Sequence, residues 1–222
     1  MRPIISLISL LISLIIGIYS APSHNKKLYT KVFPGFLFIS LLVEIISVYR
    51  NWKHLNTIFI YNIFTVIEFS FYLWLIFEII NKKRAKKIIG FAIGFYFITA
   101  AINIFFIQGL HHFHTLTYSL GCLLIVAACI YYFYELFERP HFINLLKEPP
   151  FWICTGLMFF YTCSFPIYGL SNLLLSLPKI FIKNIGTFII LLNVFLYTMF
   201  TIAFLCKIKV RKSSLSLSSV AS

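Results

Sequence analysis

Long apolar stretches alternate with short polar clusters along the whole chain, and this pattern predicts its elements. The apolar stretches cover approximately residues 3–21, 28–49, 55–80, 87–107, 113–136, 151–175 and 181–206. Since a helix rises about 1.5 Å per residue, each stretch is long enough to cross about 30 Å of hydrocarbon with some tilt. The pattern therefore predicts an all-α fold, a polytopic bundle of seven transmembrane helices.

The composition agrees with a membrane protein. Of the 222 residues, 60% are hydrophobic and only 11% are charged, and the mean hydropathy is +0.93. A soluble domain has more polar groups than this on its surface, so the expected partner is the lipid bilayer. The formal net charge of +13 would suggest a nucleic-acid partner in a soluble protein. Here most of that charge lies in short loops, where membrane topology explains it, and no nucleic-acid partner is expected.

The basic residues predict the direction of each helix. The loops after the first, third and fifth stretches, together with the segment after the last, hold most of the 19 Lys and Arg residues, and only five lie on the other side. The positive-inside rule then places the N-terminus outside and the C-terminus in the cytoplasm, as in a multi-pass protein of the inner (cytoplasmic) membrane. We expect one transmembrane domain over residues 1–206 and a basic, serine-rich, disordered cytoplasmic tail over residues 207–222.

The first apolar stretch has a second interpretation. Arg2, the apolar run and the Ser20-Ala21 pair resemble a signal peptide. Cleavage after Ala21 would leave the basic cluster at residues 82–87 outside, which contradicts the positive-inside rule. We therefore expect the first helix to be retained.

No known catalytic or cofactor motif is present in the sequence. The cysteines are odd in number and include no C-x-x-C pair, which favours small apolar packing over a disulfide framework or a zinc site. Aspartate is missing, there is no P-loop or Rossmann glycine pattern, and histidines do not pair across spans as haem ligation requires. We expect no cofactor and no enzymatic activity.

Two carboxylates lie inside predicted spans. Glu44 falls in the outer third of the second span, and Glu68 falls near the middle of the third. An ionisable group at this depth is costly and usually faces the bundle interior. One interpretation is a carboxyl that fixes helix packing by hydrogen bonds. The other is a ligand contact, an ion site or a proton carrier.

Polar residues at helical spacing extend the case for a site. Tyr61, Thr65, Glu68 and Tyr72 share one face of the third span, because helical neighbours recur at three and four residues. Other spans carry similar polar positions, mostly in their outer halves. We predict an outward-opening ligand pocket formed by Glu44, Tyr61, Thr65, Glu68, Asn103, Tyr168, Asn172 and Asn193. The alternative is ordinary interhelical hydrogen bonding.

The sixth predicted span contains a helix breaker. Pro166 removes a backbone hydrogen bond in mid-span, and Gly169 follows three residues later. We predict a hinge at Pro166 and Gly169, with a purely structural kink as the alternative.

Histidines and acidic residues mark the two ends of the bundle. His54, His111, His112 and His114 share the predicted outer side, where they can ligate zinc or copper or sense pH. No carboxylate or cysteine accompanies them, so we favour a solvated cluster without metal. At the inner end, Glu135 and Glu138 are expected to anchor the fifth helix, with contacts to the basic loop at residues 82–87.

One segment carries a resemblance to known proteins. It comprises Pro150-Phe151-Trp152-Ile153, then Gly156-Leu157 and Tyr161. On these residues the chain resembles the small stand-alone seven-helix membrane proteins of bacteria. It is similar in topology to the seven-helix input modules of bacterial sensor kinases. Because the kinase part is missing, the resemblance implies a sensory protein without enzymatic output.

These observations leave three functional hypotheses. The first is a receptor-like protein that senses a small or lipidic ligand from outside and signals through a membrane or cytoplasmic partner. The second is a small transporter or channel in which Glu68 couples a proton or cation. The third is a lipid-active intramembrane enzyme that uses Glu44 and Glu68 as acid and base.

Overall fold

A computed structural model of the chain describes residues 2–20, 28–109, 112–138, 144–169 and 179–220. These residues form seven α-helices: α1 (Arg2–Ser20), α2 (Tyr29–Trp52), α3 (Ile58–Ile79), α4 (Lys83–Ile102), α5 (Thr115–Phe137), α6 (Pro149–Gly169) and α8 (Lys179–Val220). A π-helical turn, η1 (Asn103–Ile107), extends α4, and a 3-10 turn, η2 (Leu145–Lys147), precedes α6. The predicted all-α fold is confirmed.

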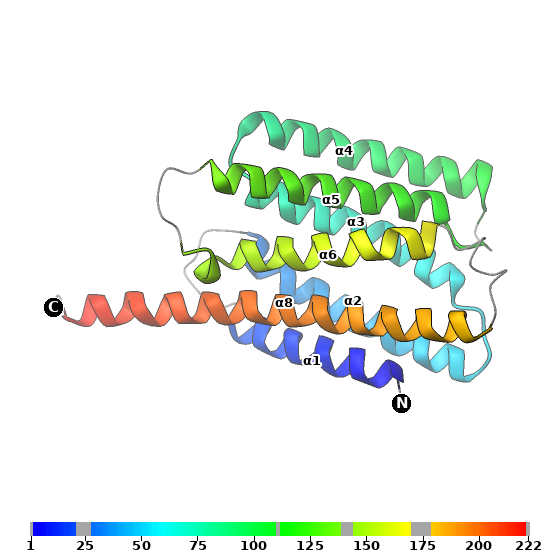
Figure 1. Ribbon diagram of the computed structural model, residues 1–222, viewed down its shortest axis with the longest axis horizontal. Helices are drawn as coiled ribbons and strands as arrows, with labels where there is room; N and C mark the ends of the chain where they lie inside the picture. Colours follow the sequence, from blue (N-terminus) through cyan, green and yellow to red (C-terminus); the bar gives the residue numbers. More distant parts are fainter. Residues whose placement is uncertain (1, 21–27, 110–111, 139–143, 170–178, 221–222) are drawn as a thin grey trace.

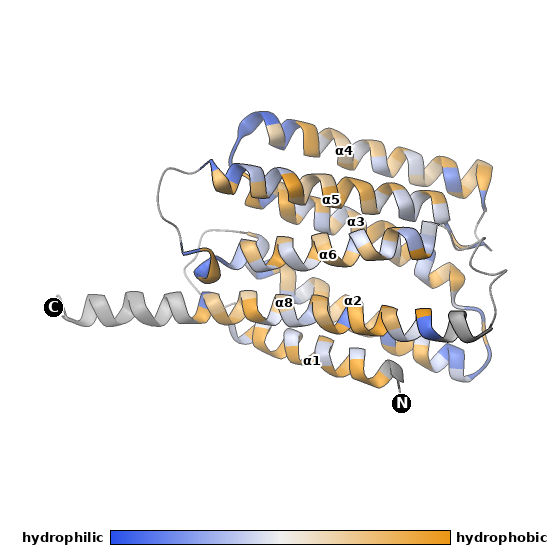
Figure 2. Ribbon diagram, in the orientation of Figure 1, coloured by the Kyte–Doolittle hydropathy of each residue, from blue (hydrophilic) through white to orange (hydrophobic). Residues whose placement is uncertain are grey.

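Six of the described helices are long and apolar enough to cross a membrane. They are α2, α3, α4 with η1, α5, α6 and the part of α8 from Asn184 to Ile208. The α1 segment Ile4–Ser20 is also apolar but is shorter. Most residues along the helices are hydrophobic, and hydrophilic residues gather at the helix ends (Figure 2). Large rings such as Phe91, Phe105 and Phe106 are 76%, 78% and 83% exposed, as in helices that lipid surrounds.

The helices lie side by side with alternating direction (Figure 1). α6 packs against both α5 and α8, α3 packs against α4 and α5, and α1 packs against α8 and α2. In the view of Figure 1, α4 forms the upper edge of the bundle and α1 the lower edge. Helices that are far apart in the sequence, such as α1 and α8, therefore lie against one another.

Aromatic rings fill the centre of the bundle. The fully buried Phe69 ring contacts those of Tyr96, Tyr118 and Tyr161, with centroids 5.7, 5.2 and 5.0 Å away. Gly121 of α5 permits this packing, because a Cβ there would lie 2.6 Å from ring atoms of Phe69. Such tilted and edge-on pairs are the arrangements that aromatic quadrupoles favour.

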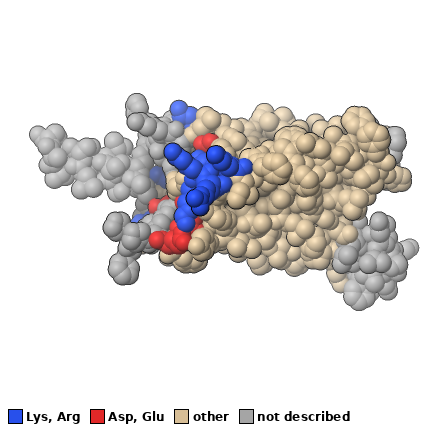
Figure 3. Space-filling view, turned by 90° about the horizontal axis from the view of Figure 1, so that it is seen from above, with Lys and Arg blue, Asp and Glu red and all other residues tan. Residues whose placement is uncertain are grey.

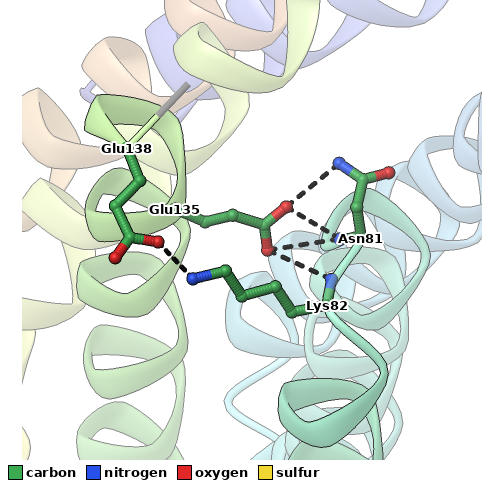
Figure 4. Close-up of polar contacts among 4 residues, drawn as sticks. All are labelled: Asn81, Lys82, Glu135 and Glu138. Carbon is green, nitrogen blue, oxygen red and sulfur yellow. Dashed lines mark hydrogen bonds and ion pairs between the residues drawn. The ribbon is translucent and has the colours of Figure 1, made fainter. Parts of the chain in front are cut away.

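Polar contacts join α5 to the turn between α3 and α4. The buried Glu135 carboxylate accepts hydrogen bonds from the Asn81 N–H at 3.0 Å, the Asn81 amide at 3.1 Å and the Lys82 N–H at 3.4 Å. The exposed Lys82 and Glu138 form an ion pair beside it (Figure 4). The expected contact between the end of α5 and the basic 82–87 segment is therefore confirmed.

The basic residues of this segment lie at one end of the bundle. Lys83, Arg84 and Lys87 are exposed on the first turns of α4. In the space-filling view, Lys and Arg gather near one end of the molecule with acidic side chains beside them, and the long described surface next to them carries neither (Figure 3).

The last helix differs from the expectation for the tail. α8 continues to Val220, whereas we expected residues 207–222 to be disordered. No glycine or proline occurs between Gly186 and Val220 to end the helix. The division of the chain at residue 206 stays a prediction.

Candidate functional site

A cavity of about 400 Å³ lies inside the bundle, between α1, α2, α3, α5, α6 and α8. It is closer to the end where α3 and α5 begin than to the basic end. Its lining consists of Ser6, Ser40, Glu44, Tyr61, Phe64, Thr65, Glu68, Phe113, Tyr118, Phe160, Tyr168, Ile189, Asn193 and Tyr197.

Six of the eight predicted pocket residues line this cavity. α3 contributes Tyr61, Thr65 and Glu68, which share a face because they are four and three residues apart. The other three come from one helix each, namely Glu44 from α2, Tyr168 from α6 and Asn193 from α8. The structure therefore brings together residues that are up to 149 positions apart in the sequence.

The two carboxyl groups, Glu44 and Glu68, line the same cavity. Glu44 and Glu68 are both half-buried, and each is within electrostatic range of the other. The ion pair found among the described residues is that of Lys82 with Glu138, so no described Lys or Arg neutralises either cavity carboxylate. The pair is acidic and has no cationic partner among these residues.

Buried tyrosines surround Glu68. Tyr72, Tyr161 and Tyr197 all interact electrostatically with its carboxylate. The Tyr161 hydroxyl is directed at Glu68, yet no hydrogen bond of normal geometry joins Tyr161 Oη to a described atom. Because the side chain is fully buried, this hydroxyl keeps its hydrogen-bonding capacity for the Glu68 carboxylate.

Aromatic rings form much of the remaining wall. Tyr168 lies 4.6 Å from Tyr118 and 5.5 Å from Phe113 between ring centroids, and Phe113 lies 5.7 Å from Tyr118. Phe64, Phe160 and Ile189 add apolar surface. The cavity therefore combines an acidic pair with an aromatic wall.

Asn103 does not lie in this cavity, which corrects the prediction. Its Nδ2 donates to Thr117 Oγ1 at 2.7 Å and to Gln108 Oε1 at 2.9 Å, and its carbonyl accepts the Gln108 N–H at 2.9 Å. The last bond spans five residues and belongs to the π-helical turn η1. Asn103 lies in a helical turn as expected, but neither α4 nor η1 contributes a residue to the cavity lining. Asn172 lies outside the described residues.

Both residues of the predicted hinge, Pro166 and Gly169, lie near the end of α6. α6 continues through Pro166 and ends at Gly169. Pro166 is exposed, and a Cβ on Gly169 would lie 2.7 Å from Ser119 Oγ, so α6 approaches α5 closely at this point. The hinge at Pro166 and Gly169 stays a prediction, because residues 170–178 lie outside the described part.

Among the predicted outer-side histidines, His114 and His54 have different structural roles. His114 is buried, with Nε2 2.6 Å from the Gly109 carbonyl oxygen. Asn62 secures the same segment, since its amide donates to the His112 carbonyl at 2.8 Å and accepts the His114 N–H at 3.2 Å. His114 is thus part of a packed turn instead of a solvated cluster.

His54 ends α2. It has a φ of 56°, and its N–H and that of Leu55 donate to the carbonyls of Asn51 and Arg50. This is a Schellman motif with histidine at the left-handed position. His111 lies outside the described residues, and the described ones contain no group of three or more metal-ligating side chains.

Sequence reasoning missed the contribution of α1. Ser6 lines the cavity, and Ser13 and Ser20 are buried below it along the helix. These three serines recur every seven residues, a spacing that places them on one helical face and that was visible in the sequence. Ser40 and the phenylalanines of the wall were also missed, because in an apolar chain they carry no distinguishing pattern.

Comparisons with protein-family models, with curated proteins and with solved structures give no match for this chain.

Proposed function

We propose that this chain is a receptor-like multi-pass membrane protein, without enzymatic activity, that binds a small or lipidic ligand in the cavity. The supporting observation is the gathering of Glu44, Tyr61, Thr65, Glu68, Tyr168 and Asn193 around one space. Carboxyl groups inside an apolar bundle are costly and are usually retained for a function. A volume of about 400 Å³ also falls within the range of small-molecule sites.

The orientation belongs to the same proposal. With 19 residues, α1 measures roughly 28 Å at 1.5 Å per residue, which suffices for a seventh span with little tilt. The loops richest in Lys and Arg then face the cytoplasm of a cell whose inner membrane holds the protein. The N-terminus and the nearby cavity face outward, and a signal passes to a membrane or cytoplasmic partner, as the likeness to sensor-kinase input modules suggests.

A transporter or channel is the second candidate. Its supporting observation is the position of Glu68 near the middle of α3, beside the cavity and without an ion-pair partner among the described residues. A carboxyl in this setting is suited to carry a proton or a cation.

Ligand binding and flux separate these candidates. The protein, purified in detergent, is screened by thermal unfolding against a library of amines, acids, sugars and lipids, and any hit is then tested for uptake into proteoliposomes. We expect stabilisation by a ligand, lost in Glu68→Gln, without uptake. Uptake that disappears in Glu68→Gln would replace the receptor by the transporter. Turnover of a lipid, lost in both Glu44→Gln and Glu68→Gln, would favour the enzyme.

A further inference from the structure

The charge of the cavity restricts what it can hold. Glu44 and Glu68 are its ionisable carboxylates, and the described lining residues include no Lys, Arg or His. Two carboxyl groups that line one apolar cavity without a cationic side chain favour a positive charge beside them over a further negative one. A positive charge on an occupant would balance the charge of these carboxylates.

The aromatic wall fits the same occupant. Seven of the 14 lining residues are Phe or Tyr, and the Phe113, Tyr118 and Tyr168 rings pack on one another to form one side of the cavity. The negative faces of aromatic rings attract ammonium groups, most strongly where water is excluded. Carboxylates together with several rings form the type of cage that binds alkylammonium groups.

The apolar part of the lining argues against a bare metal cation. Mg²⁺ and Ca²⁺ are bound through oxygen atoms on all sides, whereas this lining sets apolar side chains (Phe64, Phe113, Phe160 and Ile189) among its oxygen-bearing ones. No described group of three or more His, Cys, Asp or Glu side chains is arranged for metal. The carbon atoms of an organic cation, in contrast, find contacts on this surface.

Two further polar groups, the Tyr161 hydroxyl and the Asn193 amide, suit a bound organic cation. The fully buried Tyr161 Oη, directed at Glu68, has no hydrogen-bond partner of normal geometry, so it can donate to the carboxylate that the cation pairs with. Asn193, which lines the cavity, donates along α8 to the Ile189 carbonyl at 3.0 Å, and this bond leaves its amide oxygen as an acceptor. A protonated amine offers N–H donors to that acceptor.

From these observations we infer that the cavity binds a small organic cation, an alkylammonium or protonated amine, whose charge is balanced by Glu44 and Glu68 and whose carbon atoms lie on the aromatic wall. This inference names the ligand class and rests on the proposed ligand-binding function.

The test compares ligands of matched shape and different charge. Choline is set against 3,3-dimethyl-1-butanol, its uncharged isostere, and butylammonium is set against butyrate. Sodium chloride forms a further arm. Binding to the full-length protein in detergent is measured by calorimetric titration and by the shift of the unfolding midpoint. Each titration is repeated with Glu68→Gln, Glu44→Gln and Glu78→Gln.

Glu78 provides the matched control. It is a carboxylate of the same helix, ten residues from Glu68 and outside the cavity lining. We expect an ammonium ligand to bind at least tenfold more tightly than its uncharged or anionic counterpart. We expect Glu68→Gln or Glu44→Gln to weaken that binding at least tenfold, and Glu78→Gln to leave it unchanged. The unfolding midpoint of each variant without ligand shows that it is folded.

The remaining outcomes distinguish failure of the cationic ligand class from failure of the proposed receptor function. Preference for the uncharged isostere, for butyrate or for sodium alone would overturn the cationic ligand while the binding cavity stands. Equal loss of binding in all three variants would also overturn it. No binding in any arm, together with no hit in the wider library, would overturn the proposed receptor function itself.

Discussion

The backbone conformation of His54 indicates that this residue terminates α2. It occupies the left-handed region at the end of α2, where its N–H and that of Leu55 close the last turn. Glycine adopts this conformation without the clash that a Cβ causes. We predict that His54→Gly raises the free energy of unfolding by about 1 kcal/mol, the approximate cost of a left-handed non-glycine residue. Denaturant unfolding in detergent measures the change.

The control for this prediction is His54→Ala, which keeps a Cβ and should bring no gain. A His54→Gly variant that is less stable than the wild type would show that the imidazole, and not the backbone, is what matters at this position. The four histidines of the predicted outer side were expected to form a solvated cluster, but the backbone angle of His54 and the burial of His114 give these two residues separate structural roles.

At the scale of elements, Glu135 determines how α4 begins. The first turn of α4 contains basic residues and no acidic ones, a charge distribution that opposes the positive end of the helix dipole. Lys82, at the N-cap, makes no capping bond with its own side chain. The Glu135 carboxylate of α5 accepts the N–H groups of Asn81 and Lys82 from across the bundle and supplies negative charge there.

We therefore predict that Glu135→Ala lowers the free energy of unfolding by about 2 kcal/mol, because it removes hydrogen bonds that a buried charged acceptor makes to backbone donors. Glu135→Gln should lose less, since an amide oxygen still accepts. Thermal unfolding and the rate of amide hydrogen exchange at the α3–α4 turn give the measurement. An Ala variant as stable as the wild type, with unchanged exchange, would contradict the capping role.

Glu138 is the matched control, because it is an exposed carboxylate one turn away. The Lys82 ammonium and the Tyr134 hydroxyl hold the pKa of Glu138 below its usual range, and Glu138 raises the pKa of Lys82. Stability from the lowered Glu138 pKa is present above the pKa of an unfolded glutamate and is lost as the pH falls through the folded value. Solvent screens this exposed pair, so Glu138→Gln should change stability little near neutral pH.

The element boundaries followed local sequence signals only in part. Apolar length predicted the helices correctly, yet the basic residues assigned to the loop at 82–87 form the first turns of α4, and α8 runs beyond Cys206. Lys and Arg are good helix formers, and their charge predicts which side of the membrane they lie on rather than where a helix ends. Charge led us to expect a contact of Glu135 with the 82–87 segment, but its hydrogen bond from the backbone N–H of Lys82, 53 residues away, is not visible in a local window.

For the whole molecule, the prediction concerns orientation. The α3–α4 turn and the end of α5 lie at one end of the bundle, and Asn62 meets His112 at the other. We predict that Arg84→Cys reacts with a membrane-impermeant maleimide only after permeabilisation, because the proposed orientation places the basic end in the cytoplasm. Lys53→Cys should react in intact cells. Both positions are exposed, and wild-type labelling corrects for the native cysteines. Reaction of Arg84→Cys in intact cells would reverse the topology.

The sequence by itself determined the all-α class, the number and approximate place of the apolar helices and the polar face of α3. These properties depend on run length, periodicity and charge, which are local along the chain. The tertiary structure decided which polar faces meet. It placed Glu44, Glu68 and Asn193 on one cavity, moved Asn103 to a separate network and added Ser6 of α1. The reason is that the rotation and neighbours of each helix follow from side-chain packing across the bundle, as where Phe69 lies against Gly121, and no single helix encodes that packing.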